Sequence, residues 1–279
     1  MIVFKTSDII VATLRKEFYM KLFSNKALVT YMLPGGLGEK LPEEAARAAA
    51  RGADVIGLQL ESISPRLVTP SFIGEVISAS KDKPVYLTAY RRGNPTPSKT
   101  DEMLAEELLT GLDLGAKIID VPAYMFSDSK IEVSYDEYSV RKQRELIEEI
   151  HKRGGIALMS SHMFRFMERS EVFELARTHE SRGADITKIV TDADSESELT
   201  ENLIISAELK NQVKIPYLFL CNGKFCARHR MLTAALGSCM MLTSTDEQPK
   251  NPQPDLDMAK DILGLIERHQ ISLGEINSK

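Results

Sequence analysis

The chain has 279 residues, of which 43% are hydrophobic and 27% are charged, and this globular composition excludes a disordered or fibrous protein. The 35 Lys and Arg against 40 Asp and Glu give a net charge of −5, which disfavours a nucleic-acid binder because such proteins present a basic surface. We also expect no membrane partner, because no apolar run approaches the ~20 residues that cross a bilayer and the first residues lack the pattern of a signal peptide.

Two apolar runs, MIVF at 1–4 and DIIVATL at 8–14, begin the chain, and both are expected to be extended. Eight further runs rich in β-branched and aliphatic residues each predict a buried strand. They lie at 27–33, 54–60, 84–90, 117–123, 155–161, 186–192, 215–221 and 239–245. Between them, apolar residues recur at the spacing of amphipathic helices. These helices are predicted at 42–50, 100–115, 136–154, 168–183, 197–211, 225–237 and 254–269.

The joints between these predicted elements repeat. Gly52, Gly115, Gly154 and Gly183 each follow a predicted helix and precede a strand, as the C-terminal glycines of helices do. The regular alternation favours a single-domain (β/α)8 TIM barrel over 27–279, with 1–26 as an N-terminal extension covering one barrel end. A doubly wound sheet is the alternative, and it is disfavoured because no G-x-G-x-x-G follows the first strand.

In such barrels the chemistry takes place at the C-terminal ends of the strands. The second strand ends with Gln59 and Glu61, which share a face because they are two residues apart. Arg91 and Arg92 follow the third strand, where they either bind a carboxylate or are solvated, and Tyr124 after the fourth strand is a candidate pocket wall.

His162 is the only one of the five histidines at the C-terminal end of a predicted strand, and this position favours a functional role. His151, His179 and His269 lie on predicted helices and are expected at the surface, where they complement helix dipoles.

Lys188 lies inside the sixth predicted strand, on the face it shares with Ile186 and Val190. Burying an unpaired charge is unfavourable, so one interpretation pairs this lysine with a carboxylate such as Glu61. The other interpretation is chemical: desolvation lowers the pKa of a lysine and generates the free amine that forms a Schiff base with a carbonyl. A histidine on the neighbouring strand would then move the protons.

The segment after the seventh strand carries Arg230, which is able to bind a carboxylate. The chain has three cysteines, Cys221, Cys226 and Cys239, and this odd number in a long chain indicates reduced thiols and a cytoplasmic protein.

The segments ALMSSHMF (157–164), ADITKIV (184–190) and KFCARHRMLTAALGS (224–238) match, in this order, motifs of a known family. Residues 27–269 resemble the type I 3-dehydroquinate dehydratases, which are Schiff-base enzymes of the shikimate pathway and of aromatic amino acid biosynthesis. The resemblance implies that Lys188 forms the imine, His162 is the general acid/base, Arg230 holds the substrate carboxylate and Gln253 lies in a loop over the substrate. It implies no cofactor and no metal, and it is compatible with a homodimer.

The resemblance has departures at the second and third strands. The E-x-R positions of the family fall on Gly57 and Gln59, and the arginine position falls on Tyr90. We keep Gln59, Arg91 and Arg92 as candidate substrate-binding residues. The predicted substrate is 3-dehydroquinate or a related carboxylated hydroxyketone, because a changed polar shell changes the accepted ligand. A class I aldolase and a non-catalytic carboxylate-binding barrel remain alternatives.

Overall fold

A computed structural model of the chain describes residues 6–23, 26–91, 99–128, 131–244 and 253–268. Its eight strands form one parallel sheet in the order β7-β6-β5-β4-β3-β2-β1-β8. The strands are β1 (Leu28–Met32), β2 (Val55–Gln59), β3 (Val85–Thr88), β4 (Ile118–Pro122), β5 (Ile156–His162), β6 (Ile186–Asp192), β7 (Tyr217–Asn222) and β8 (Met240–Thr243). Because the first strand pairs with the last, the sheet curves round on itself.

β7 and β8, the two ends of this strand order, meet at Cys239, the residue before β8. Its backbone N–H donates to the carbonyl of Tyr217 at the start of β7 (2.8 Å), and its carbonyl accepts from Leu28 at the start of β1 (2.9 Å). The predicted (β/α)8 barrel is confirmed, and the doubly wound sheet is wrong.

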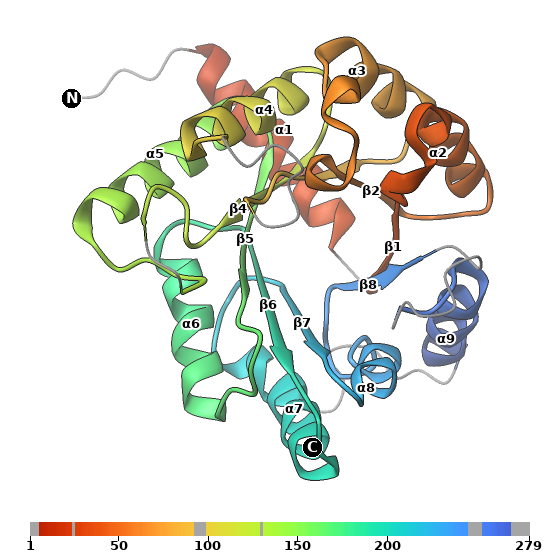
Figure 1. The fold of residues 1–279 in the computed structure, drawn as a ribbon, viewed down its shortest axis with the longest axis vertical. Helices are drawn as coiled ribbons and strands as arrows, with labels where there is room; N and C mark the ends of the chain where they lie inside the picture. The colour runs from red at the N-terminus through yellow and green to blue at the C-terminus, as the bar shows by residue number, and fades with distance from the viewer. Residues whose placement is uncertain (1–5, 24–25, 92–98, 129–130, 245–252, 269–279) are drawn as a thin grey trace.

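The helices follow the strands around the outside of the barrel (Figure 1). They are α2 (Leu41–Ala50), α3 (Pro70–Ala79), α4 (Asp101–Asp113), α5 (Glu137–Lys152), α6 (Arg169–Ser181), α7 (Glu196–Glu208), α8 (Cys226–Leu232) and α9 (Leu256–Arg268), with short 3-10 turns at Gly35–Lys40, Leu60–Ser62, Pro65–Leu67 and Leu209–Asn211. The glycines at the joints before β2, β4, β5 and β6 all have φ between 80° and 115°, a conformation that side chains with a Cβ rarely adopt. The repeated helix-to-strand turn is therefore confirmed.

Alternate strand residues fill the barrel interior. The interior cluster takes at least one residue from each strand, including Leu28, Val55, Tyr86, Ile118, Ile156, Ile186, Leu218 and Met240. A second, larger cluster lies between the strands and the surrounding helices. Val190 also belongs to the interior cluster, which shows that the face of β6 carrying Lys188 points into the barrel.

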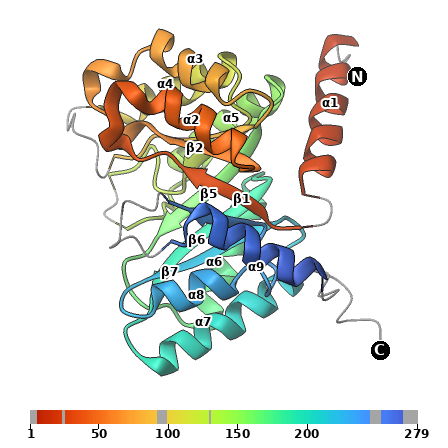
Figure 2. The same cartoon turned by 90° about the vertical axis from the view of Figure 1, so that its right-hand side faces the viewer.

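The N-terminal segment is helical: α1 spans Thr6–Leu22, so the prediction of an extended run at 8–14 is wrong, and the run at 1–4 lies outside the described residues. Figure 2 shows α1 outside the ring of helices, on the side where β1 begins. Phe18, Tyr19, Leu22 and Phe23 pack against the interior cluster. Apolar contact with the barrel stabilises this helix, since tertiary packing supplies most of the stability of short helices.

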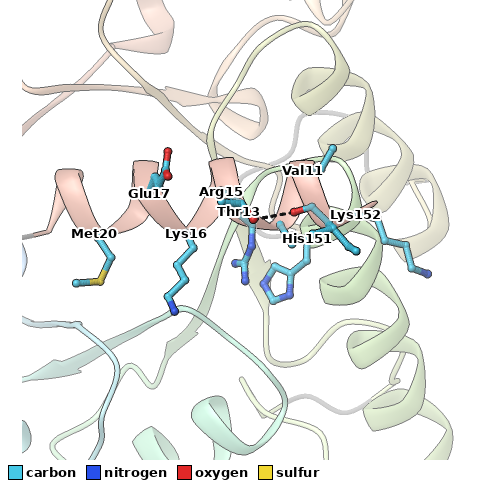
Figure 3. A pocket seen from close by; sticks show the side chains of 10 residues that line it. Val11, Thr13, Arg15, Lys16, Glu17, Met20, His151 and Lys152 are labelled. Carbon is cyan, nitrogen blue, oxygen red and sulfur yellow. Dashed lines mark hydrogen bonds between the residues drawn. The ribbon is translucent and has the colours of Figure 1, made fainter. Parts of the chain in front are cut away.

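Charged side chains also attach α1 to the end of the barrel where the strands begin. Arg15 binds Asp185, just before β6, at 2.7 and 2.9 Å, and His151 of α5 binds the same carboxylate at 2.8 Å. Figure 3 shows Arg15 and His151 side by side in a hollow of about 850 Å³ between α1 and α5. Within the parts of the chain that the structure describes, no helix has the length and apolar character needed to span a membrane.

Candidate active site

Lys188 lies midway along β6 and points into the barrel, with only 6% of its side chain exposed. Its Nζ is 3.0 Å from the hydroxyl of Tyr86, 2.9 Å from that of Tyr90 and 3.5 Å from Oδ2 of Asp120. Both phenols donate to the same Asp120 oxygen, and Ser160 donates to the other oxygen of this carboxylate. The lysine therefore belongs to a closed polar cluster inside an apolar barrel.

Burial determines the electrostatics of this cluster. Desolvation lowers the pKa of Lys188 below its ordinary value, and the opposing effects of Asp120 and Glu61 are smaller. Desolvation, reinforced by the charge of Asp120, raises the pKa of both Tyr86 and Tyr90, so these phenols keep their protons at neutral pH. The lowered pKa makes the neutral amine, which is the form that attacks a carbonyl, easier to generate than in water.

Glu61 forms a second polar group next to the cluster. The hydroxyl of Thr88 is 2.9 Å from both carboxylate oxygens of Glu61, and the amide of Gln59 donates to one of them at 3.2 Å. Burial raises the pKa of this carboxyl group. The sequence-based pairing of Lys188 with Glu61 needs correction, because the carboxylate that contacts Lys188 is Asp120.

His162 ends β5 on the same inward face as Ser160, which lies opposite Lys188 in the register between β5 and β6. Its ring meets the ring of Tyr90 edge-on, with centroids 5.1 Å apart. The structure therefore brings the two predicted catalytic residues to adjacent strands, with Tyr90 in contact with both.

Arg230, on α8, is 7% exposed and extends back to the end of β7. Its Nε donates to the carbonyl of Cys221 (3.0 Å), and an Nη donates to Oδ1 of Asn222 (2.9 Å). Gln253 is half-buried beside the end of β8, where the next residue accepts a backbone hydrogen bond from Ser244 (3.1 Å). Both residues thus lie at the C-terminal end of the barrel.

Arg91 lies apart from the lysine cluster. Its guanidinium forms a two-point contact with Asp101 at the start of α4 (2.7 and 2.8 Å) and donates to the carbonyls of Tyr124 and Ser127. It also stacks over the ring of Tyr124, 4.5 Å from the centroid. These contacts attach the loop after β3 to the loop after β4. Arg92 lies outside the described residues.

One histidine prediction is wrong. His179 on α6 is completely buried, and its ring contacts the hydroxyls of Ser161 (3.1 Å) and Thr187 (2.8 Å). Burial lowers its pKa to about 3, so the ring is neutral and links α6 to β5 and β6.

Sequence reasoning missed Asp120 and the role of the two tyrosines. The signal for Asp120 was present, since an aspartate inside the apolar run IIDVPA is as unusual as a lysine inside ITKIVTD. In the sequence, Tyr86 and Tyr90 look like ordinary strand residues. Only the structure shows that their hydroxyl groups contact Lys188.

The comparisons with known proteins agree with this geometry. The family described as type I 3-dehydroquinase matches residues 32–270 of the chain. The chain belongs to the type I 3-dehydroquinase family. It is therefore a hydro-lyase of the dehydroquinase type, as the sequence motifs predicted.

Solved structures of 3-dehydroquinate dehydratases share the fold. The 3-dehydroquinate dehydratase from Clostridium difficile, solved with covalently modified comenic acid, has a TM-score of 0.76 at 16% identity, over 88% of this chain and 95% of that one. The enzyme from Geobacillus kaustophilus has 0.73 at 13%, over 88% and 93%, and that from Aquifex aeolicus has 0.65 at 18%, over 86% and 99%. At these identities the similarity establishes the fold alone. No curated protein matches the chain in sequence.

Proposed function

We propose that this dehydroquinase-family enzyme dehydrates 3-dehydroquinate to 3-dehydroshikimate, a step of the shikimate pathway, through a Schiff base on Lys188. The observation that carries the proposal is the buried amine of Lys188 inside the barrel, held by two phenols and a carboxylate. His162 and Arg230 lie next to it at the C-terminal ends of β5 and β7, the barrel end where such folds perform chemistry. Desolvation of the buried Nζ lowers the pKa of Lys188 and so favours formation of the neutral nucleophile.

The reaction follows from the placement of these groups. The amine attacks the ketone of the substrate and loses water to form an iminium ion. His162, on the adjacent strand, removes a proton from the carbon next to the iminium carbon. The resulting enamine expels the hydroxyl group from the following carbon, and His162 returns its proton to this group so that it leaves as water. Hydrolysis of the product iminium regenerates Lys188. Arg230 supplies N–H donors for the substrate carboxylate.

The surroundings of β2 support a close relative of 3-dehydroquinate as a second candidate substrate. A Cβ at Gly57 would lie 2.3 Å from the sulfur of Met32, so an apolar side chain occupies the space beside this position. Gln59, at the other departure from the family pattern, is engaged with Glu61. This wall of the barrel offers less polar recognition of hydroxyl groups, and it favours a carboxylated ketone with fewer of them.

Turnover tests the proposal directly. Dehydration creates a carbon–carbon double bond conjugated with the ketone, so the product is followed by its ultraviolet absorbance. We expect the wild type to convert 3-dehydroquinate and Lys188→Met to lose all turnover. A folded wild type that cleaves a carbon–carbon bond instead would be an aldolase. If a carboxylated ketone stabilises both proteins equally against heat and neither turns it over, the chain is a binding protein.

We also propose a cytoplasmic location, supported by the three free thiols of Cys221, Cys226 and Cys239. Cell fractionation tests this location. A homodimer is a further expectation, and the molar mass of the protein in solution decides it.

A further inference from the structure

The hydrogen bonds around Lys188 have a fixed direction. Each phenol has a single proton, and Tyr86 and Tyr90 both give theirs to Oδ2 of Asp120. The phenol oxygens therefore accept from Lys188, whose Nζ is 3.0 Å from one and 2.9 Å from the other. Two parallel chains thus run from the ammonium group through a phenol to the same carboxylate oxygen, while the direct distance from Nζ to that oxygen is 3.5 Å.

Other charged and titratable groups face this cluster from every side. Glu61 lies beyond Thr88, Arg230 reaches the end of β7, and His162 contacts the outer face of the Tyr90 ring. Glu61 is bound by Thr88 and Gln59, and Arg230 has no proton to release at neutral pH. Asp120, which is fully buried, is the carboxylate in hydrogen-bond contact with both phenols.

We propose that Tyr86 and Tyr90 are catalytic residues that relay a proton between Lys188 and Asp120 during imine formation. The inference rests on the proposed Schiff-base function and assigns the proton transfers that this function requires. Both residues contact Nζ, the reacting atom, and Tyr90 occupies the position where the family motif has an arginine.

The proton transfers balance. The ammonium of Lys188 gives a proton to a phenol oxygen as that phenol passes its own proton to Asp120, which leaves a neutral amine, an unchanged phenol and a carboxylic acid. The amine adds to the ketone and gives a carbinolamine. Asp120 then returns its proton through the phenol to the carbinolamine hydroxyl, which leaves as water, and the nitrogen lone pair forms the iminium ion. His162 remains available for the carbon-bound proton.

The test measures how fast the iminium forms. The enzyme is mixed with 3-dehydroquinate and quenched with borohydride after increasing times, and the reduced adduct is quantified by intact mass. We expect Tyr86→Phe/Tyr90→Phe to slow adduct formation by about 10²- to 10⁴-fold, the usual contribution of a positioned acid or base. In this variant the rate should rise with pH and with the concentration of added imidazole, because an external base must deprotonate Lys188.

A matched control removes a phenol from another carboxylate. Tyr31 donates to Glu44 on the outer side of β1, away from Lys188, so Tyr31→Phe should leave the rate of adduct formation unchanged. If the double variant does not fold, Tyr90→Phe alone is used, because Tyr90 is half-buried whereas Tyr86 is completely buried. It removes one of the two chains to Asp120, so adduct formation should slow, but by less than in the double variant.

The outcomes separate the two proposals. A wild-type adduct that forms equally fast in the folded double variant overturns the relay and leaves the Schiff base standing. Slower formation without any response to imidazole also overturns the relay, because it indicates that the phenols only position the lysine. The absence of an adduct in the folded wild type overturns the proposed function itself.

Discussion

Replacing Asp120 with asparagine should destabilise the protein more at low pH than at high pH. Asp120 Oδ2 lies 3.5 Å from the amine of Lys188, and neither side chain exposes more than 6% of its surface. At an effective dielectric constant of about 20, two unit charges at such a distance attract each other by about 5 kcal/mol. The Asp120→Asn substitution keeps a similar side-chain volume but removes this attraction.

The direction of the pH effect follows from proton binding. Burial lowers the pKa of Lys188 below 10.5, so the unfolded chain binds more protons than the native one and stability rises with pH between the two pKa values. Asp120 opposes this lowering of the Lys188 pKa. Its loss lowers that pKa further and extends to lower pH the range over which stability rises with pH. The extra destabilisation of Asp120→Asn should therefore grow by up to about 1.4 kcal/mol per pH unit as the pH falls. Between pH 9 and pH 6 this gives at most about 4 kcal/mol.

The assay is urea unfolding at pH 6 and pH 9, followed by circular dichroism because the chain contains no tryptophan. Glu44→Gln is the matched control: Glu44 is also buried and binds a phenol and Arg47, but an arginine does not release its proton in this range. Its effect on stability should be the same at both pH values. An Asp120→Asn effect that is equal at both pH values, or larger at pH 9, would show that Asp120 does not raise the pKa of Lys188 in the native protein.

Three further predictions concern single residues. His162→Gln should lower kcat by about 10²- to 10⁴-fold while borohydride still traps the adduct, and full activity would contradict its role. Arg230→Lys should lower kcat/KM by about 10- to 100-fold because a lysine lacks the two-point contact with a carboxylate, and unchanged kinetics would exclude that contact. Gly183→Ala should lower the free energy of unfolding by about 1–2 kcal/mol because the φ of Gly183 is 97°. Gly36→Ala should have little effect, because a Cβ at Gly36 would meet no atom within 4 Å. Equal losses of stability in the two variants would show that the positive φ of Gly183 is not the cause.

The sequence was sufficient for the barrel and for the set of residues that share a face with Lys188. Strand residues alternate with a period of two, so Ile186 and Val190 had to lie on the same side as the lysine. Both faces of a barrel strand are buried, so alternation did not say which of them points inward. The helix-to-strand joints were predictable for a similar reason, because glycine is the residue that adopts positive φ without strain.

Short apolar runs were a less reliable guide to whether a segment forms a strand or a helix. IIV at 9–11 is β-branched and typical of a strand, but residues 11, 15, 18 and 22 have the spacing of a helix face that packs on the barrel. Tertiary contacts decide between these interpretations, as the packing of Phe18 and Leu22 against the interior cluster illustrates.

The lysine cluster was the hardest part to predict. Alternation within one strand says which residues share a face with Tyr86, Asp120 or Lys188, but not whether these three side chains lie at the same level along the barrel axis. That level depends on the stagger between β3, β4 and β6, which the sequence does not reveal. Arg91 shows the related problem at a loop, because its contact with Asp101 depends on where the segment after β3 turns.

The most direct test of the central claim is the identity of the trapped residue. The wild-type protein is incubated with 3-dehydroquinate and borohydride, digested, and analysed by peptide mass spectrometry. We predict one reduced substrate adduct on Lys188, absent from Lys188→Met. A folded wild type without an adduct, or with the adduct on another lysine, would contradict it.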